Sequence, residues 1–133
     1  YTDNLYSLIK KEKNNIENIN IIFNDPIRRE EYRQYLKKEF NATITSSSSN
    51  NIEISSINAN KGHALETLCN HIGISSENVL AFGDSENDIS MLDFAGEGVL
   101  MENSDFSIRK SHFVISTSCD NYGVARIIEQ LTN

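Results

Sequence analysis

The sequence predicts an α/β fold in which a parallel sheet with helices follows a smaller unit that mixes helix and strand. Three observations support this prediction. From residue 58 onward, apolar runs of strand length alternate with segments of helical periodicity, which is typical of a parallel sheet. Before residue 58, a longer helical segment precedes two short stretches of alternating apolar and polar residues. The polar string Gly-Asp-Ser-Glu-Asn-Asp at 83–88 directly follows the apolar run at 79–82, where open α/β sheets bind ligands.

Along the first part of the chain, the pattern predicts a helix over 2–12 and a strand over 19–23. A second helix is expected over 26–40, because Asp25 followed by proline is a typical helix start and Asn41 is a plausible stop. The apolar residues of this helix are expected on its buried side, namely Ile27, Tyr32, Tyr35, Leu36 and Phe40.

Two stretches, 42–46 and 51–57, are predicted to pair as a β-hairpin. The second stretch alternates apolar and polar residues, as a half-buried strand does, and the serines at 46–49 form the expected connection. We therefore expect a domain boundary after this hairpin, with residues 1–57 in one domain and 58–133 in the other.

The second part of the chain is predicted to begin with a helix over 62–72. Its apolar residues recur at helical spacing, and Gly73 marks its end. These apolar residues are Leu65, Leu68, Cys69 and Ile72. The elements expected next are a strand over 78–82, a helix over 86–94, a strand over 97–101, a short helix over 104–110, a strand over 112–115 and a last helix over 121–131.

Two carboxylates are prominent in the string after the apolar run. Asp84 lies at the carboxyl end of a predicted strand, and Asp88 comes about one helical turn later, so that both can face the same point. Such a pair suits Mg²⁺, which takes few carboxylates and completes its shell with water and phosphate oxygens. The structural alternative is that Ser85 or Asp84 only caps the helix that follows.

Lys61 lies at the start of the predicted helix over 62–72. A cation at this end of a helix is unfavourable, because the helix dipole already places partial positive charge there. An anion near Lys61, such as a phosphate, would remove the conflict. The alternative is a solvated surface lysine, which is the usual environment of this residue type. Beside the acidic pair, phosphate binding is the favoured interpretation.

Composition limits the classes of function. The 133 residues are within the range of one domain, and the net charge of −7 argues against non-specific nucleic-acid binding, which needs clustered positive charge. No apolar run approaches the length that a membrane crossing needs. Cys69, on the apolar face of a predicted helix, and Cys119, in a polar segment, predict no disulfide and favour a reducing, cytoplasmic location.

A long series of residues around the acidic pair matches one known family. The series comprises Asn60-Lys61-Gly62, Ala64-Leu65, Gly73-Ile74, the run 79–92, Ala95-Gly96, Gly98-Val99, Met101, Asn103 and 122–125. It resembles the haloacid dehalogenase (HAD) superfamily, and within it the Cof-type sugar-phosphate phosphatases. The resemblance is specific over 57–131 and extends more loosely back to about residue 19. It implies a Rossmann-like HAD core, here incomplete, and part of an α+β cap domain that closes over the active site.

The resemblance also implies a role for each of four residues. Lys61 resembles the family's phosphate-binding lysine, and Asn87 resembles the amide that bonds the substrate phosphate. Asp84 resembles the acidic residue that binds Mg²⁺, and Asp88 resembles its partner in the metal site. Lys61, Asp84 and Asp88 are therefore the expected catalytic residues of a Mg²⁺-dependent phosphatase of small phosphorylated metabolites, sugar phosphates in particular.

The chain departs from the family's pattern in one respect. The family's nucleophile is an Asp in an Asp-x-Asp motif that precedes the lysine, and no such motif is found in this sequence. The nearest Asp after an apolar run is Asp25, but Ile27 stands two residues later and the intervening proline indicates a helix cap. We expect the nucleophile in a missing N-terminal part of the same protein, and this chain alone to be inactive. The alternative is a non-catalytic fragment that binds phosphate or a partner.

Overall fold

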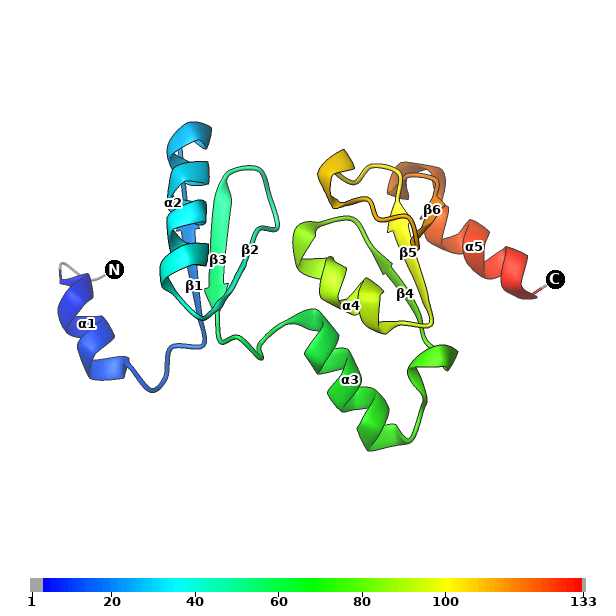
Figure 1. Ribbon diagram of the computed structural model, residues 1–133, viewed down its shortest axis with the longest axis horizontal. Helices are drawn as coiled ribbons and strands as arrows, with labels where there is room; N and C mark the ends of the chain where they lie inside the picture. The colour runs from blue at the N-terminus through cyan, green and yellow to red at the C-terminus, as the bar shows by residue number, and fades with distance from the viewer. Residues whose placement is uncertain (1–3, 133) are drawn as a thin grey trace.

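The computed structural model describes residues 4–132. It contains two three-stranded sheets, each with its own helices (Figure 1). We call the part from α1 (Leu5–Glu12) to β3 (Asn51–Ser55) the N-terminal unit, and the part from α3 (Lys61–Ile72) to α5 (Gly123–Thr132) the C-terminal unit. The domain boundary expected after residue 57 falls between these units and stays a prediction.

The N-terminal unit is an antiparallel sheet with a long helix against it. The strand order is β1 (Asn18–Ile22), β3, β2 (Thr43–Thr45), and both neighbours of β3 run antiparallel to it. Helix α2 (Pro26–Glu39) packs on β2 and β3, and Ile44 and Ile52 are buried. The predicted hairpin is confirmed, and α1 confirms the predicted first helix over its described residues.

The serine-rich turn between β2 and β3 is organised by one side chain. Asn51 is buried, and its Oδ1 accepts hydrogen bonds from the backbone N–H groups of Ser47 (3.2 Å) and Ser48 (3.0 Å). Its amide nitrogen donates to the side-chain oxygens of Asn20 (3.2 Å) and Glu53 (3.0 Å). The predicted connection at 46–49 is confirmed, and Asn51 holds its backbone in place.

Helix α2 begins as the sequence predicts. The Asp25 carboxylate accepts hydrogen bonds from the backbone N–H groups of Ile27 (2.9 Å) and Arg28 (3.3 Å), and Pro26 is the first helical residue. Such a cap satisfies N–H groups that have no partner inside the helix. The interpretation of Asp25 as a helix cap is confirmed.

The buried side of α2 was predicted wrongly. The side chains of Arg29 and Arg33 are each only 15% exposed. Arg29 donates from Nε to the backbone oxygen of Asn51 (3.0 Å) and from its guanidinium group to Ser46 Oγ. The hairpin presents oxygen atoms to α2, so guanidinium groups pack there and the aromatic side chains turn outward. The exposed fractions are 72% for Ile27, 54% for Tyr32, 55% for Tyr35 and 53% for Phe40, while Leu36 is half-buried.

The C-terminal unit contains the predicted parallel sheet. Strands β4 (Leu80–Gly83), β5 (Glu97–Met101) and β6 (Val114–Ser116) pair in parallel in this order. Helix α4 (Ile89–Phe94) packs on β4 and β5, and α3 packs on α4. The buried core consists of Ala81, Leu92, Leu100 and Phe113. Short 3₁₀ helices complete the unit, at η1 (Ser76–Asn78), η2 (Glu86–Asp88), η3 (Phe106–Ile108) and η4 (Cys119–Asn121).

The ends of α3 agree with the sequence, but its apolar face is only partly covered. Gly73 ends the helix with a φ of 73°, in the left-handed region that favours glycine. Cys69 is buried, whereas Leu68 and Ile72 are 52% and 54% exposed.

Among residues 4–132, no helix is both long and apolar enough to cross a membrane.

Helices α3 and α4 approach each other closely at Gly62. The backbone N–H of Gly62 donates to Ser90 Oγ (3.0 Å). A Cβ atom at residue 62 would lie 2.3 Å from the backbone oxygen of Ser90, which is too close for any side chain. Glycine at this position therefore allows the start of α3, and with it Lys61, to lie against α4.

We expect the substitution Gly62→Ala to lower the free energy of unfolding by about 1–3 kcal/mol, because the added methyl group must push the two helices apart. Thermal unfolding of the two proteins measures the difference. The matched control is Asn70→Ala, at an exposed position of the same helix, which should change stability by less than about 0.5 kcal/mol. Equal unfolding temperatures for Gly62→Ala and the parent protein would contradict the close approach.

Candidate functional site

The acidic loop at 84–88 begins where β4 ends. Asp84 comes directly after Gly83, the last residue of the strand, and Glu86–Asp88 form η2. A Cβ atom on Gly83 would lie 2.5 Å from the Cβ atom of Asp88, so glycine lets the loop close against the strand. The predicted place of Asp84, at the carboxyl end of a strand, is confirmed.

Asp88 is the organising residue of the acidic loop. Its side chain is only 8% exposed. One carboxylate oxygen, Oδ2, accepts hydrogen bonds from the backbone N–H groups of Asp84 and Ser85, each at 3.1 Å. The other oxygen, Oδ1, forms an ion pair with Lys61 Nζ. Both oxygens of this buried carboxylate are thus satisfied, as burial of a charge requires.

Lys61 is the first residue of α3, and its positive charge has an anionic partner there. The sequence predicts that a cation at this helix end needs a nearby anion, and the Asp88 carboxylate fills that need. The Lys61 side chain remains 50% exposed, so its ammonium group has further donors available to solvent. Phosphate binding by Lys61 stays a prediction.

Asp84 is exposed, and both of its oxygens accept hydrogen bonds. Ser85 Oγ donates to Oδ1 (2.9 Å), and Asn103 Nδ2 donates to Oδ2 (3.2 Å). The Asn103 oxygen accepts from the backbone N–H of Cys119 (3.1 Å), which can only donate, so the amide nitrogen must face Asp84. The sequence analysis gave Asn103 no role. Its place just after β5, the neighbour of β4, is the signal that would have located it.

Residues of the acidic loop line two hollows. The first is a cleft of about 760 Å³ between the two units, and Asp84, Ser85 and Glu86 line it. The second, of about 700 Å³, is lined by Lys61 and Asn87 together with residues of β2 and β3. The N-terminal unit contributes Arg29, Glu30, Arg33 and the serines at 46–49 to the first cleft. The predicted site residues are therefore close together but face two spaces, with Asp88 in contact with both Lys61 and the loop.

Asn87 carries a buried polar atom that lacks a partner. Its Oδ1 is inaccessible to solvent and forms no hydrogen bond within the part of the chain that the structure describes. Buried polar atoms of this kind are rare, and they often mark a place where water, an ion or a ligand binds. The role of Asn87 in substrate binding stays a prediction.

The chemistry of the site fits a magnesium ion. Asp84 and Asp88 offer oxygen atoms at one strand end, and Mg²⁺ is commonly held by one or two carboxylates, with water and phosphate completing the shell. Within residues 4–132, no three His, Cys, Asp or Glu side chains converge on one point. Asp84 is the more accessible candidate, since the oxygens of Asp88 are engaged by Lys61 and the loop. Both ligand assignments stay predictions.

Known proteins resemble this chain over most of its length. It is 40% identical over 89 residues to the phosphatase YwpJ of Bacillus subtilis, covering 67% of this chain and 31% of that protein. It is 38% identical over 107 residues to the 5-amino-6-(5-phospho-D-ribitylamino)uracil phosphatase YcsE of the same organism, covering 80% of this chain and 43% of that protein. The chain thus spans less than half the length of these relatives.

Solved structures and a protein family give the same result. A haloacid dehalogenase-like hydrolase from B. subtilis matches with a TM-score of 0.80 and 34% identity, over 86% of this chain and 40% of that one. The family described as haloacid dehalogenase-like hydrolase matches residues 1–128. The predicted resemblance and the predicted α/β class with a parallel sheet are confirmed. The chain therefore belongs to the haloacid dehalogenase-like hydrolase family.

Proposed function

We propose that this chain is part of a Mg²⁺-dependent phosphatase that hydrolyses small phosphorylated metabolites. The observation that carries the proposal is the contact between Lys61 and Asp88 beside Asp84, at the carboxyl end of β4. This arrangement brings a cation and two carboxylates to one strand end. Phosphoryl transfer requires such groups, because it depends mainly on positioning and on neutralising charge.

In this proposal, each predicted residue has one task. Asp84 and Asp88 hold Mg²⁺, which when bound supplies positive charge to the phosphoryl oxygens. Lys61 neutralises charge on the nucleophile and on the transferring group, and its exposed ammonium group supports this role. Asn87 bonds the substrate phosphate by donating from its side-chain NH₂ group, and its place beside Lys61 in the lining of one hollow supports this role.

The nucleophile is proposed to lie in an N-terminal part of the same protein, outside this sequence. Asp25, the nearest candidate after a strand, holds the start of α2. The relatives are more than twice as long as the matched region, which supports a further segment. The phosphoryl group would pass to that Asp as an aspartyl-phosphate and then to water, so this chain alone is expected to be inactive.

A hydroxyl-rich cleft supports sugar phosphates as the substrates. Six serines line it, Ser46, Ser47, Ser48, Ser49, Ser85 and Ser107. Its charged lining has four carboxylates against two guanidinium groups, so a second phosphate would be repelled. Hydroxyl groups of a neutral sugar match such walls, while Mg²⁺ held at Asp84, which lines the same cleft, would attract the single phosphate. A cytoplasmic location is part of the proposal, and the free Cys69 and Cys119 support it.

We expect Asp84→Asn, introduced into the intact protein, to lower Mg²⁺-dependent phosphatase activity at least about 100-fold, because one metal-binding charge is lost. The fold should be retained, since Asp84 is exposed. Activity against a panel of sugar phosphates, with and without Mg²⁺, tests this expectation. Asp120→Asn, at an exposed carboxylate outside the site, is the control. Full activity of Asp84→Asn would refute the assignment, and an inactive parent protein would favour a non-catalytic phosphate-binding role.

A second prediction separates Asp88 from Asp84. Asp88→Asn should lower the activity, and it should also lower the free energy of unfolding by about 1–3 kcal/mol. The reason is that the ion pair with Lys61 is lost and the loop N–H groups lose a charged acceptor. Asp84→Asn should lower activity alone. Thermal unfolding of both variants without metal makes the comparison. Equal stability of the two variants would show that Asp88 does not organise the loop.

A further inference from the structure

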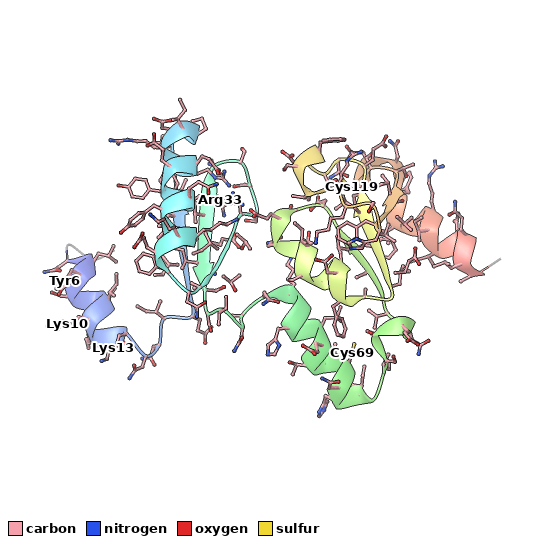
Figure 2. All side chains as sticks on the ribbon, in the orientation of Figure 1. Tyr6, Lys10, Lys13, Arg33, Cys69 and Cys119 are labelled. Carbon is pink, nitrogen blue, oxygen red and sulfur yellow. The ribbon has the colours of Figure 1, made fainter. Side chains whose placement is uncertain are left out.

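Glu86, in the middle of the acidic loop, is bound by two cations from the other unit. Its Oε1 forms an ion pair with Arg33 Nη2 and another with Lys37 Nζ (3.1 Å). Arg33 and Lys37 are four residues apart on α2, so they lie on one face of the helix. Figure 2 labels Arg33 on α2. Both ion pairs connect the N-terminal unit to the loop that carries Asp84.

This contact is better shielded from water than an ordinary surface ion pair. The exposed fractions are 15% for the Arg33 side chain, 24% for Glu86 and 39% for Lys37. Exposed pairs contribute little, whereas removal of one partner from a buried pair leaves an uncompensated charge. Arg33 also contacts Glu30 (3.4 Å), so it bridges two carboxylates. A hydrogen bond from Gln34 and the charges of Arg33 and Arg29 lower the pKa of Glu30, against the opposing effect of burial.

The contact also lies where the two units enclose the cleft. Arg33 and Glu86 both line the cleft of about 760 Å³. Other packing in the described chain is concentrated inside each unit, such as α2 on β3 and α3 on α4. The position of one cleft wall relative to the other therefore depends strongly on the bonds to Glu86.

From these observations we propose that Arg33 and Lys37 are positioning residues that act through Glu86. They hold the N-terminal unit over the acidic loop and so set the width of the cleft. They also neutralise the Glu86 carboxylate, which lines the same cleft as Asp84. The expected effect on catalysis rests on the proposed function. The placement of the N-terminal unit over the acidic loop does not depend on any activity.

The primary test measures the distance between the units in the intact protein without substrate. Spin labels are placed on Cys119, which is exposed in the C-terminal unit (Figure 2), and on a cysteine introduced by Glu31→Cys on α2, with any other accessible thiol replaced by serine. Cys69 is buried and stays unlabelled. Arg33→Gln combined with Lys37→Met should broaden the distance distribution and shift it to longer values. An unchanged distribution would overturn the proposal.

A matched control and a conservative variant make the result specific. Lys38→Met removes a neighbouring charge whose side chain is 82% exposed and pairs at 3.8 Å with Glu39, so the distance distribution should not change. Arg33→Lys keeps a positive charge between Glu30 and Glu86, so it should stay close to the parent distribution, whereas Arg33→Glu should broaden it strongly. Equal broadening in Lys38→Met, or equal broadening in Arg33→Lys and Arg33→Glu, would count against a specific contact.

The kinetic consequence is measured separately. If the intact protein is a phosphatase, Arg33→Gln with Lys37→Met should raise KM about tenfold, a typical size for coupling between sites, with a smaller change in kcat. If the parent protein shows no phosphatase activity, the proposed function is refuted, but the distance measurement remains valid. A normal KM in a double variant with an altered distance would refute the positioning role.

Discussion

The buried carboxylate of Asp88 is the interaction on which the candidate site depends. One oxygen accepts two backbone N–H groups of the loop, and the other pairs with Lys61. Because a buried charge is costly unless its oxygens are satisfied, the loop and the start of α3 must be placed together. Gly62 contributes to the same end, since it lets α3 approach α4. The position of Lys61 thus follows from helix packing and electrostatics at once.

Much of the fold could be predicted because its elements begin and end at residues with strong backbone preferences. Asp25 and Pro26 start α2, and Gly73 ends α3. The buried side of α2 could not be predicted, because the rule that apolar residues face inward fails there. Arg29 and Arg33 are buried because they bind oxygen atoms and carboxylates of residues that are mostly distant in sequence. The local sequence pattern of α2 does not indicate those partners.

In the candidate site too, some residues could be predicted from the sequence and others could not. Asp84 and Asp88 could be located from the sequence because Asp84 directly follows a strand and Asp88 comes about one helical turn later. Their partners could not, since Asn103 bonds Asp84 across 19 positions and Arg33 bonds Glu86 across 53. Such contacts depend on which strands are neighbours and on how the two units face each other. The separation of Lys61 and Asp84 into two hollows has the same origin.

Asn51 gives one wall of the cleft an unusual freedom. Its side-chain oxygen accepts from the backbone N–H groups of Ser47 and Ser48, which every residue except proline possesses. The same amide also bonds the hydroxyl groups of Ser47 and Ser48, each at 3.1 Å. When these serines are replaced during evolution, the hydroxyl bonds are lost and the backbone bonds remain. The wall of the cleft can therefore change what it displays to a ligand, at the cost of two side-chain hydrogen bonds, while one buried amide still holds the turn.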